Sequence, residues 1–254
     1  MTQDQDRLVR LEVIDSIATV TLDSQHNRNA LSRRLVAELG ACLQEAERSP
    51  VRAIVLRHEG PAFCAGADLK ERAADDGPID SAPMVAVMRR LMESECPTIA
   101  AVDGAVRAGG IGLMASCDLV VVRDDVTFAL TEVRIGVAPA IISVPILQRV
   151  PASRIAAPML TGEPFTAAAA REMGLVTHVA DDVSGTVAEL CDGVCAGAPR
   201  AVAETKRLLR RVPELDRDEA FERMRILSEE LFRGADAREG MAAFREKRAP
   251  VWPS

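Results

Sequence analysis

The chain has 254 residues, of which 48% are apolar and 27% charged, and its formal net charge at pH 7 is −7. This length and composition suit one large globular domain, or one domain with a helical appendage. The acidic balance argues against a general nucleic-acid or anionic-membrane surface, and no apolar run is long enough to span a bilayer.

The six cysteines and three histidines show no spacing typical of a metal site. None of the cysteines forms a Cys-x-x-Cys pair, and the helically spaced Cys191 and Cys195 have no histidine nearby. We therefore expect no bound metal. Residues 2–6 are polar, unlike a signal peptide, so we expect the protein to reside in a reducing cytoplasm.

The first half of the chain predicts strands and helices in alternation. Residues 8–14 and 17–22 alternate apolar and polar residues, which indicates a β-hairpin. Ser32 is expected to cap a helix that ends near residue 49. Further apolar strands are predicted at residues 53–56, 99–102, 119–122 and 127–129, a helix at 84–93, and a mobile polar stretch at 73–83. Apolar strands of this kind predict an α/β fold whose sheet is covered on both faces.

Beyond residue 143 the pattern predicts helices, apart from a strand at 176–179. The last third is helical and strongly charged, with helices expected at residues 183–196, 200–211, 218–233 and 236–247. Phe221, Leu231 and Phe232 in this region are candidates for packing against a partner subunit. The basic cluster of Lys206, Arg207, Arg210 and Arg211 could bind phosphates, but a solvated helix face is the favoured interpretation.

Two short stretches place small residues directly after apolar strands. They are residues 62–69 (AFCAGADL) and residues 103–113 (DGAVRAGGIGL), and the second leads into an apolar helix. Each stretch alone could be a tight strand-to-helix turn. Together they predict that the backbone N–H groups of Ala67 and Gly109 point at one spot, as a developing oxyanion requires.

Such chemistry also needs a group that transfers a proton. The chain contains no tyrosine, and Ser116 and Ser143 lie in no nucleophile motif with a histidine. Glu132 is the best candidate because its apolar surroundings would raise its pKa. The alternatives for Glu132 are a salt bridge with Arg134 or a solvated charge. Asp68 is interpreted as a loop or helix-capping residue, and Asp118 as a structural residue at the end of a helix.

These motifs resemble the crotonase (enoyl-CoA hydratase/isomerase) family, and the resemblance runs essentially from end to end. Residues 63–70 resemble the family's first oxyanion and CoA-binding segment, and residues 104–118 its second. Residues 128–139 resemble the segment that carries a catalytic glutamate. Residues 160–176 and 239–248 are similar to two further signatures of the family.

The resemblance implies a spiral of β-β-α turns over residues 1–195 and a helical region over residues 196–254 that serves trimerisation. It implies an acyl-CoA thioester as substrate, with its carbonyl oxygen between the amides of Ala67 and Gly109. It also implies homotrimers, often paired into hexamers, and no cofactor apart from the coenzyme A of the substrate. The CoA moiety is expected along a set of residues that overlaps the oxyanion site: Ala65, Ala67, Asp68, Leu69, Lys70 and Gly109.

One position departs from the family pattern. Standard hydratases carry a first glutamate three residues after the oxyanion glycine, and this chain has Gly112 there. Glu132 matches the second glutamate. The leading expectation is an enoyl-CoA hydratase that uses Glu132 as its general acid and base. The alternatives are an isomerase, another crotonase-type reaction, or a poorly catalytic acyl-CoA-binding protein. Arg107 could contact a substrate carboxylate or have only a surface role.

Overall fold

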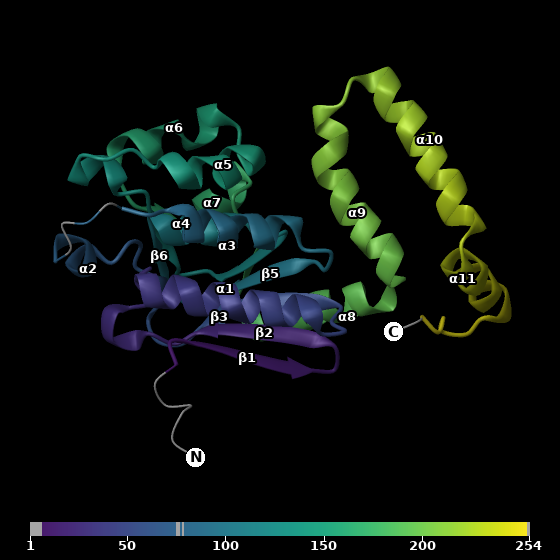
Figure 1. Ribbon diagram of the computed structural model, residues 1–254. Helices are drawn as coiled ribbons and strands as arrows, with labels where there is room; N and C mark the ends of the chain where they lie inside the picture. The colour runs from purple at the N-terminus through teal and green to yellow at the C-terminus, as the bar shows by residue number, and fades with distance from the viewer. Residues whose placement is uncertain (1–6, 75–76, 78, 253–254) are drawn as a thin grey trace, which may run out of the picture.

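The computed structural model describes residues 7–74, 77 and 79–252 (Figure 1). The chain begins with the predicted hairpin of β1 (Val9–Ile14) and β2 (Ile17–Leu22), which pair antiparallel. Asp15 and Ser16 join them with positive φ angles of 48° and 65°. This backbone conformation forms the two-residue turn whose twist matches that of a hairpin.

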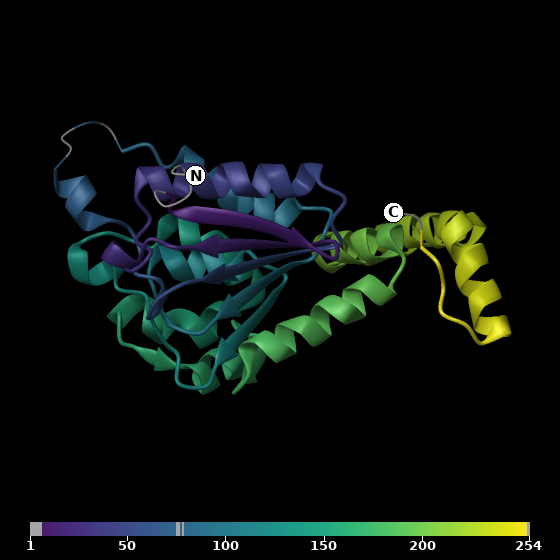
Figure 2. The same ribbon diagram turned by 90° about the horizontal axis from the view of Figure 1, so that it is seen from below.

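The larger sheet has six strands in the order β1-β2-β3-β5-β7-β10, and every pair after the hairpin is parallel. Helix α1 (Arg33–Arg48), capped by Ser32, packs on one face, and α8 (Val183–Ala196) packs on the other (Figure 2). Two covered faces explain why the inner strands read as apolar runs. The remaining strands of this sheet are β3 (Ala53–His58), β5 (Thr98–Val102), β7 (Leu119–Arg123) and β10 (His178–Ala180).

A smaller sheet has the order β4-β6-β8-β9. Its strands are β4 (Ala62–Cys64), β6 (Ala105–Arg107), β8 (Thr127–Ala129) and β9 (Phe165–Thr166). Three times the chain passes from a strand of the larger sheet to one of the smaller sheet and then to a helix, as β3–β4–α2, β5–β6–α4 and β7–β8–α5. This repetition is the expected spiral of β-β-α turns.

The connecting helices are short and several differ slightly from the predicted ranges. They are α2 (Leu69–Ala73), α3 (Ala82–Glu93), α4 (Gly109–Ala115), α5 (Ala140–Arg149), α6 (Ala152–Thr161) and α7 (Ala167–Met173), with 3₁₀ turns η1 (Gln25–Asn27), η2 (Glu132–Ile135) and η3 (Val212–Glu214). The expected mobile stretch at 73–83 includes residues 75, 76 and 78, which lie outside the described residues. Helix α3 begins two residues earlier than predicted.

The C-terminal helices are α9 (Pro199–Arg211), α10 (Arg217–Arg233) and α11 (Ala235–Glu246), each within two residues of its predicted bounds. Figures 1 and 2 show α10 and α11 extending away from the two sheets. The end of the chain returns to α8, because the indole Nε1–H of Trp252 donates to the Ala196 carbonyl at 2.8 Å. The division at residue 195 falls at the end of α8 and stays a prediction.

Candidate active site

The parallel strands of the smaller sheet bring the three predicted segments to one edge. Strand β4 pairs with β6 through Cys64 and Val106, and β6 pairs with β8 through Arg107 and Ala129. All three strands run in the same direction, so the segments that follow them leave the sheet together. Ligands of parallel sheets bind at this carboxyl edge.

The two small-residue loops touch each other at this edge. Gly66 has a φ of +89°, and a Cβ atom there would lie 2.9 Å from the Cβ of Ala108. Leu31 contacts both loops, since it pairs with Ala67 in an isolated bridge and its Cδ1 would lie 2.8 Å from a Cβ atom on Gly109. The loops that carry Ala67 and Gly109 therefore lie side by side, and the convergence of their two N–H groups stays a prediction.

Both of these backbone N–H groups are unused. Gly109 is the first residue of α4, where an N–H has no acceptor within the helix. Within residues 7–74, 77 and 79–252, neither the Ala67 nor the Gly109 N–H has a hydrogen-bond acceptor. Ala108, just before Gly109, has a φ of 47°, which is strained for alanine and typical of functional loops.

Glu132 begins η2, three residues after the end of β8. Its Oε2 is buried and has no hydrogen-bond partner in the described part of the chain. Burial raises the pKa of this carboxyl above its ordinary value, although a backbone N–H partly offsets the effect. Arg134 binds Glu163 and the Thr161 carbonyl instead, so the alternative of a Glu132–Arg134 salt bridge is wrong.

The segment after Ala67 forms the start of α2. Asp68 caps that helix by accepting the N–H groups of Lys70 and Glu71 at 3.1 Å, as the sequence indicated. The Glu71 N–H and then the Asn27 amide lower the pKa of Asp68. The Leu69 and Lys70 side chains are exposed, while Ala65 donates its N–H to the Arg28 carbonyl at 3.0 Å.

The space beside Gly112 is filled. A Cβ atom there would lie 2.6 Å from the Cβ of Ile142 and 2.8 Å from the Cε of Met88. A glutamate at this position would therefore displace the side chain of Ile142. Nothing in the sequence around Ile142 on α5 or Met88 on α3 indicated that they meet at α4, because only the fold brings these helices together.

Two other predicted residues have structural partners. The Arg107 guanidinium binds the Thr127 carbonyl at 2.5 Å and the Thr127 hydroxyl at 2.9 Å, which ties it to β8. Asp118 accepts from Thr98 and pairs with the Lys206 ammonium at 2.7 Å, so its structural interpretation is confirmed. Lys206 is buried, which corrects the solvated-face interpretation for that residue.

The described residues contain neither a metal-binding cluster nor a membrane-spanning helix. No group of three or more His, Cys, Asp or Glu side chains among them could hold a metal ion. None of their helices is long and apolar enough to cross a membrane.

Solved structures define the class of protein. An enoyl-CoA hydratase from Mycobacterium smegmatis superposes with a TM-score of 0.90 at 31% identity, covering 96% of this chain and 98% of that one. An enoyl-CoA hydratase from Mycobacterium avium is 44% identical with a TM-score of 0.73, over 96% of this chain and 98% of its own. The architecture is the crotonase fold.

The sequence comparisons identify the family. The profile of the Enoyl-CoA hydratase/isomerase family matches residues 12–254. The enoyl-CoA hydratase EchA19 of Mycobacterium tuberculosis is 32% identical over 244 residues, which are 91% of each chain. The chain belongs to the enoyl-CoA hydratase/isomerase family.

Proposed function

We propose that this protein is an enzyme of the hydratase type that adds water to the 2,3-double bond of an acyl-CoA thioester. The observation that carries the proposal is a buried carboxylate oxygen without a partner, on Glu132, at the sheet edge where two backbone amides are also unpaired. The thioester carbonyl would accept from the Ala67 and Gly109 N–H groups. The CoA moiety would follow the segment from Ala65 to Lys70, and coenzyme A is the only cofactor-like group required.

The two amides would stabilise the enolate that forms when the α-carbon gains or loses a proton. One such donor contributes roughly 3–4 kcal/mol to an oxyanion transition state. In hydration, Glu132 would take a proton from water as the oxygen bonds to the β-carbon. The same carboxyl would then deliver that proton to the α-carbon of the enolate, so a single residue serves as base and as acid.

A second reaction is favoured by the packing at Gly112. Because Ile142 fills this space, no second carboxylate can hold a water there. One carboxylate suffices for isomerisation, in which Glu132 takes a proton from one carbon of a 3-enoyl-CoA and returns it two carbons away. The protein would then move the double bond without consuming water.

The test is a panel of 2-enoyl-CoA and 3-enoyl-CoA esters with the products resolved by mass. Hydration adds the mass of one water to a 2-enoyl ester. Isomerisation leaves the mass of a 3-enoyl ester unchanged and creates the absorbance of a conjugated thioester. If no ester is converted under any condition while CoA esters still bind, the chain is an acyl-CoA-binding protein and the proposal of an enzyme is wrong.

The assembly and the compartment are part of the same proposal. Phe221 and Phe232 on α10 and Phe244 on α11 are 72%, 69% and 84% exposed, whereas Leu231 is half-buried. Apolar side chains on helices that extend from the core fit a homotrimer, or a hexamer built of two trimers. The six cysteines are free, in keeping with a reducing cytoplasm.

A further inference from the structure

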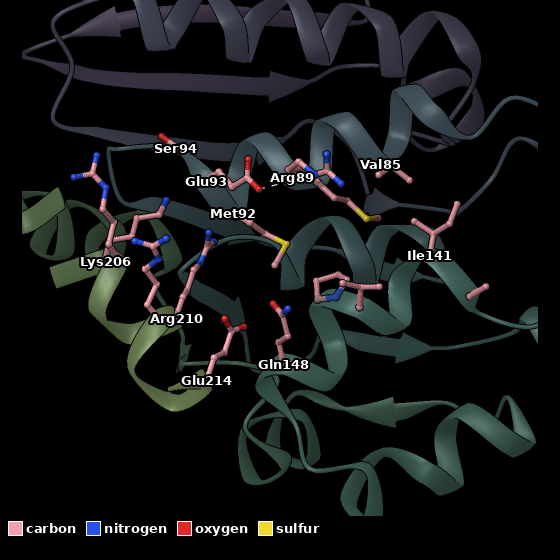
Figure 3. Close-up of a pocket in the computed structure, with 16 residues that line it drawn as sticks. Val85, Arg89, Met92, Glu93, Ser94, Ile141, Gln148, Lys206, Arg210 and Glu214 are labelled. Carbon is pink, nitrogen blue, oxygen red and sulfur yellow. Dashed lines mark ion pairs between the residues drawn. The ribbon is translucent and has the colours of Figure 1, made fainter. Parts of the chain in front are cut away.

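A cavity of about 970 Å³ lies between α3, α5 and α9 (Figure 3). Of the described residues that line it, none is Ala67, Gly109 or Glu132. Helices α3 and α5 form an apolar wall. The side chains of that wall are Val85, Met88, Met92, Ile141, Val144 and Pro145.

The opposite wall is cationic. Five cationic side chains line the cavity, Arg89 from α3 and four from α9, against the two carboxylates Glu93 and Glu214. Figure 3 shows Arg210, Glu214 and Gln148 directed toward the space beneath Met92. The cavity therefore has an apolar side and an end with an excess of positive charge.

Two of these five cations already have close partners. The Lys206 ammonium is held by Asp118 at 2.7 Å and by the Leu91 and Cys96 carbonyls, and Arg207 pairs with Glu95 and Glu204 at 2.6 Å. Arg89 pairs with Glu93 at 3.9 Å.

Arg210 and Arg211 are the exceptions. The half-buried guanidinium of Arg210 has one carboxylate within pairing range, Asp118 at 3.9 Å, and burial lowers its pKa more than Asp118 and Glu93 raise it. Arg211 is exposed and has no partner in the described part of the chain. These two arginines retain the capacity to bind an anion.

The side chain of Met88 borders both the cavity and the space beside Gly112, which it shares with Ile142. Its Cε packs at the position of Gly112. Gly112 lies three residues beyond Gly109 in α4, which is about 4.5 Å along the helix axis. Methionine is unbranched and adapts its shape to a neighbour, so Met88 can admit a chain between the two spaces.

We propose that this cavity receives the distal end of the acyl chain, and that the chain ends in a carboxylate bound by Arg210, with Arg211 at the cavity mouth. This inference rests on the proposed function and specifies its substrate class as the CoA thioesters of dicarboxylic acids. The apolar wall contacts the methylene groups. Arg107 binds Thr127 and is not among the residues that line this cavity.

The test compares two saturated, unreactive ligands of equal chain length, an acyl-CoA and an ω-carboxyacyl-CoA, by titration calorimetry. A charge-assisted hydrogen bond predicts that the carboxylated ester binds wild-type protein about tenfold tighter. Arg210→Gln and Arg211→Gln should reduce this preference, and Arg210→Lys should retain part of it. Arg48→Gln on α1 is the matched control, because Arg48 is exposed and remote in sequence yet carries the same charge.

Four results would overturn the inference. Equal affinity of wild-type protein for the two esters would remove the carboxylate subsite, while turnover of neutral esters would leave the proposed function standing. If the arginine variants lower the affinity for both esters equally, the arginines have a structural role and do not recognise the carboxylate. If an arginine variant has a different molecular mass in light scattering but still prefers the carboxylated ester, the cavity is a contact between subunits. If no CoA ester binds, the proposed function fails together with the inference.

Discussion

Glu132 has the environment of a proton-transfer group. Its Oε2 is buried without a partner among the described residues, and burial raises its pKa above the ordinary glutamate value, as suits a group that both takes up and releases a proton. Glu132→Gln should reduce turnover by about 10²- to 10⁴-fold while CoA-ester affinity stays nearly constant. Steady-state kinetics and calorimetry on the same preparation separate the two effects. Turnover that is unchanged in this variant would remove Glu132 from the mechanism.

The same residue predicts a pH dependence of stability. Because the pKa of Glu132 is raised by folding, the folded state binds the proton more tightly than the unfolded state. Stability is therefore lost as pH rises from the ordinary glutamate pKa through the raised value. Glu132→Gln removes this loss, so the variant should melt at a higher temperature than wild type at pH 8, and the difference should shrink toward pH 4. Thermal denaturation at both pH values checks the sign.

At the scale of elements, the contact of α5 with α4 decides how many carboxylates the site can hold. Gly112→Glu alone should lower the melting temperature, because the new side chain meets Ile142 and Met88. Gly112→Glu combined with Ile142→Ala provides space for the carboxylate. We expect the double variant to regain stability relative to Gly112→Glu and to raise hydration relative to isomerisation. Ile142→Ala by itself is the control, and an unchanged product ratio would show that the second carboxylate is irrelevant.

Helix α9 is attached to the core through a buried ion pair. Lys206 is 6% exposed, pairs with Asp118, and donates to the Leu91 carbonyl in α3 and to the Cys96 carbonyl in the loop after it. Lys206→Met leaves Asp118 without its ammonium, and breaking a buried pair costs about 3–5 kcal/mol. Urea denaturation should show this loss. Adding Asp118→Asn to this variant removes the unpaired negative charge and should recover part of the lost free energy of unfolding. A loss below about 1 kcal/mol in Lys206→Met would contradict the anchoring role.

The sequence predicted a helix or strand correctly where its pattern of apolar residues extended over several turns or alternations. The hairpin, α1 and the helices α8 to α11 have such patterns, and their observed bounds are close to the predicted ones. Strands β4, β6 and β9 span only two or three residues, which no alternation can reveal. The expectation that the Ala67 and Gly109 amides converge came from two small-residue stretches that follow apolar strands, and Glu132 was selected for its apolar surroundings. Ile142 and Lys206 could not be placed because their partners are distant in sequence.

For the whole molecule, the proposed homotrimer would depend on the protruding helices α10 and α11. A charged residue in an apolar contact is strongly unfavourable, so Phe221→Glu together with Phe232→Glu should convert the oligomer to monomers. Size-exclusion chromatography with light scattering measures the mass directly. An exposed charge swap away from these helices, Arg57→Glu on β3, should leave the mass unchanged. A monomeric wild-type protein would contradict the trimer proposal.

The return of the chain end to α8 has a practical consequence. Trp252 is the sole tryptophan, and the chain has no tyrosine, so ultraviolet emission excited near 295 nm comes from a single indole. That indole is held against the Ala196 carbonyl at the end of α8. Its fluorescence therefore reports on this one contact between the end of the chain and α8, without any introduced label.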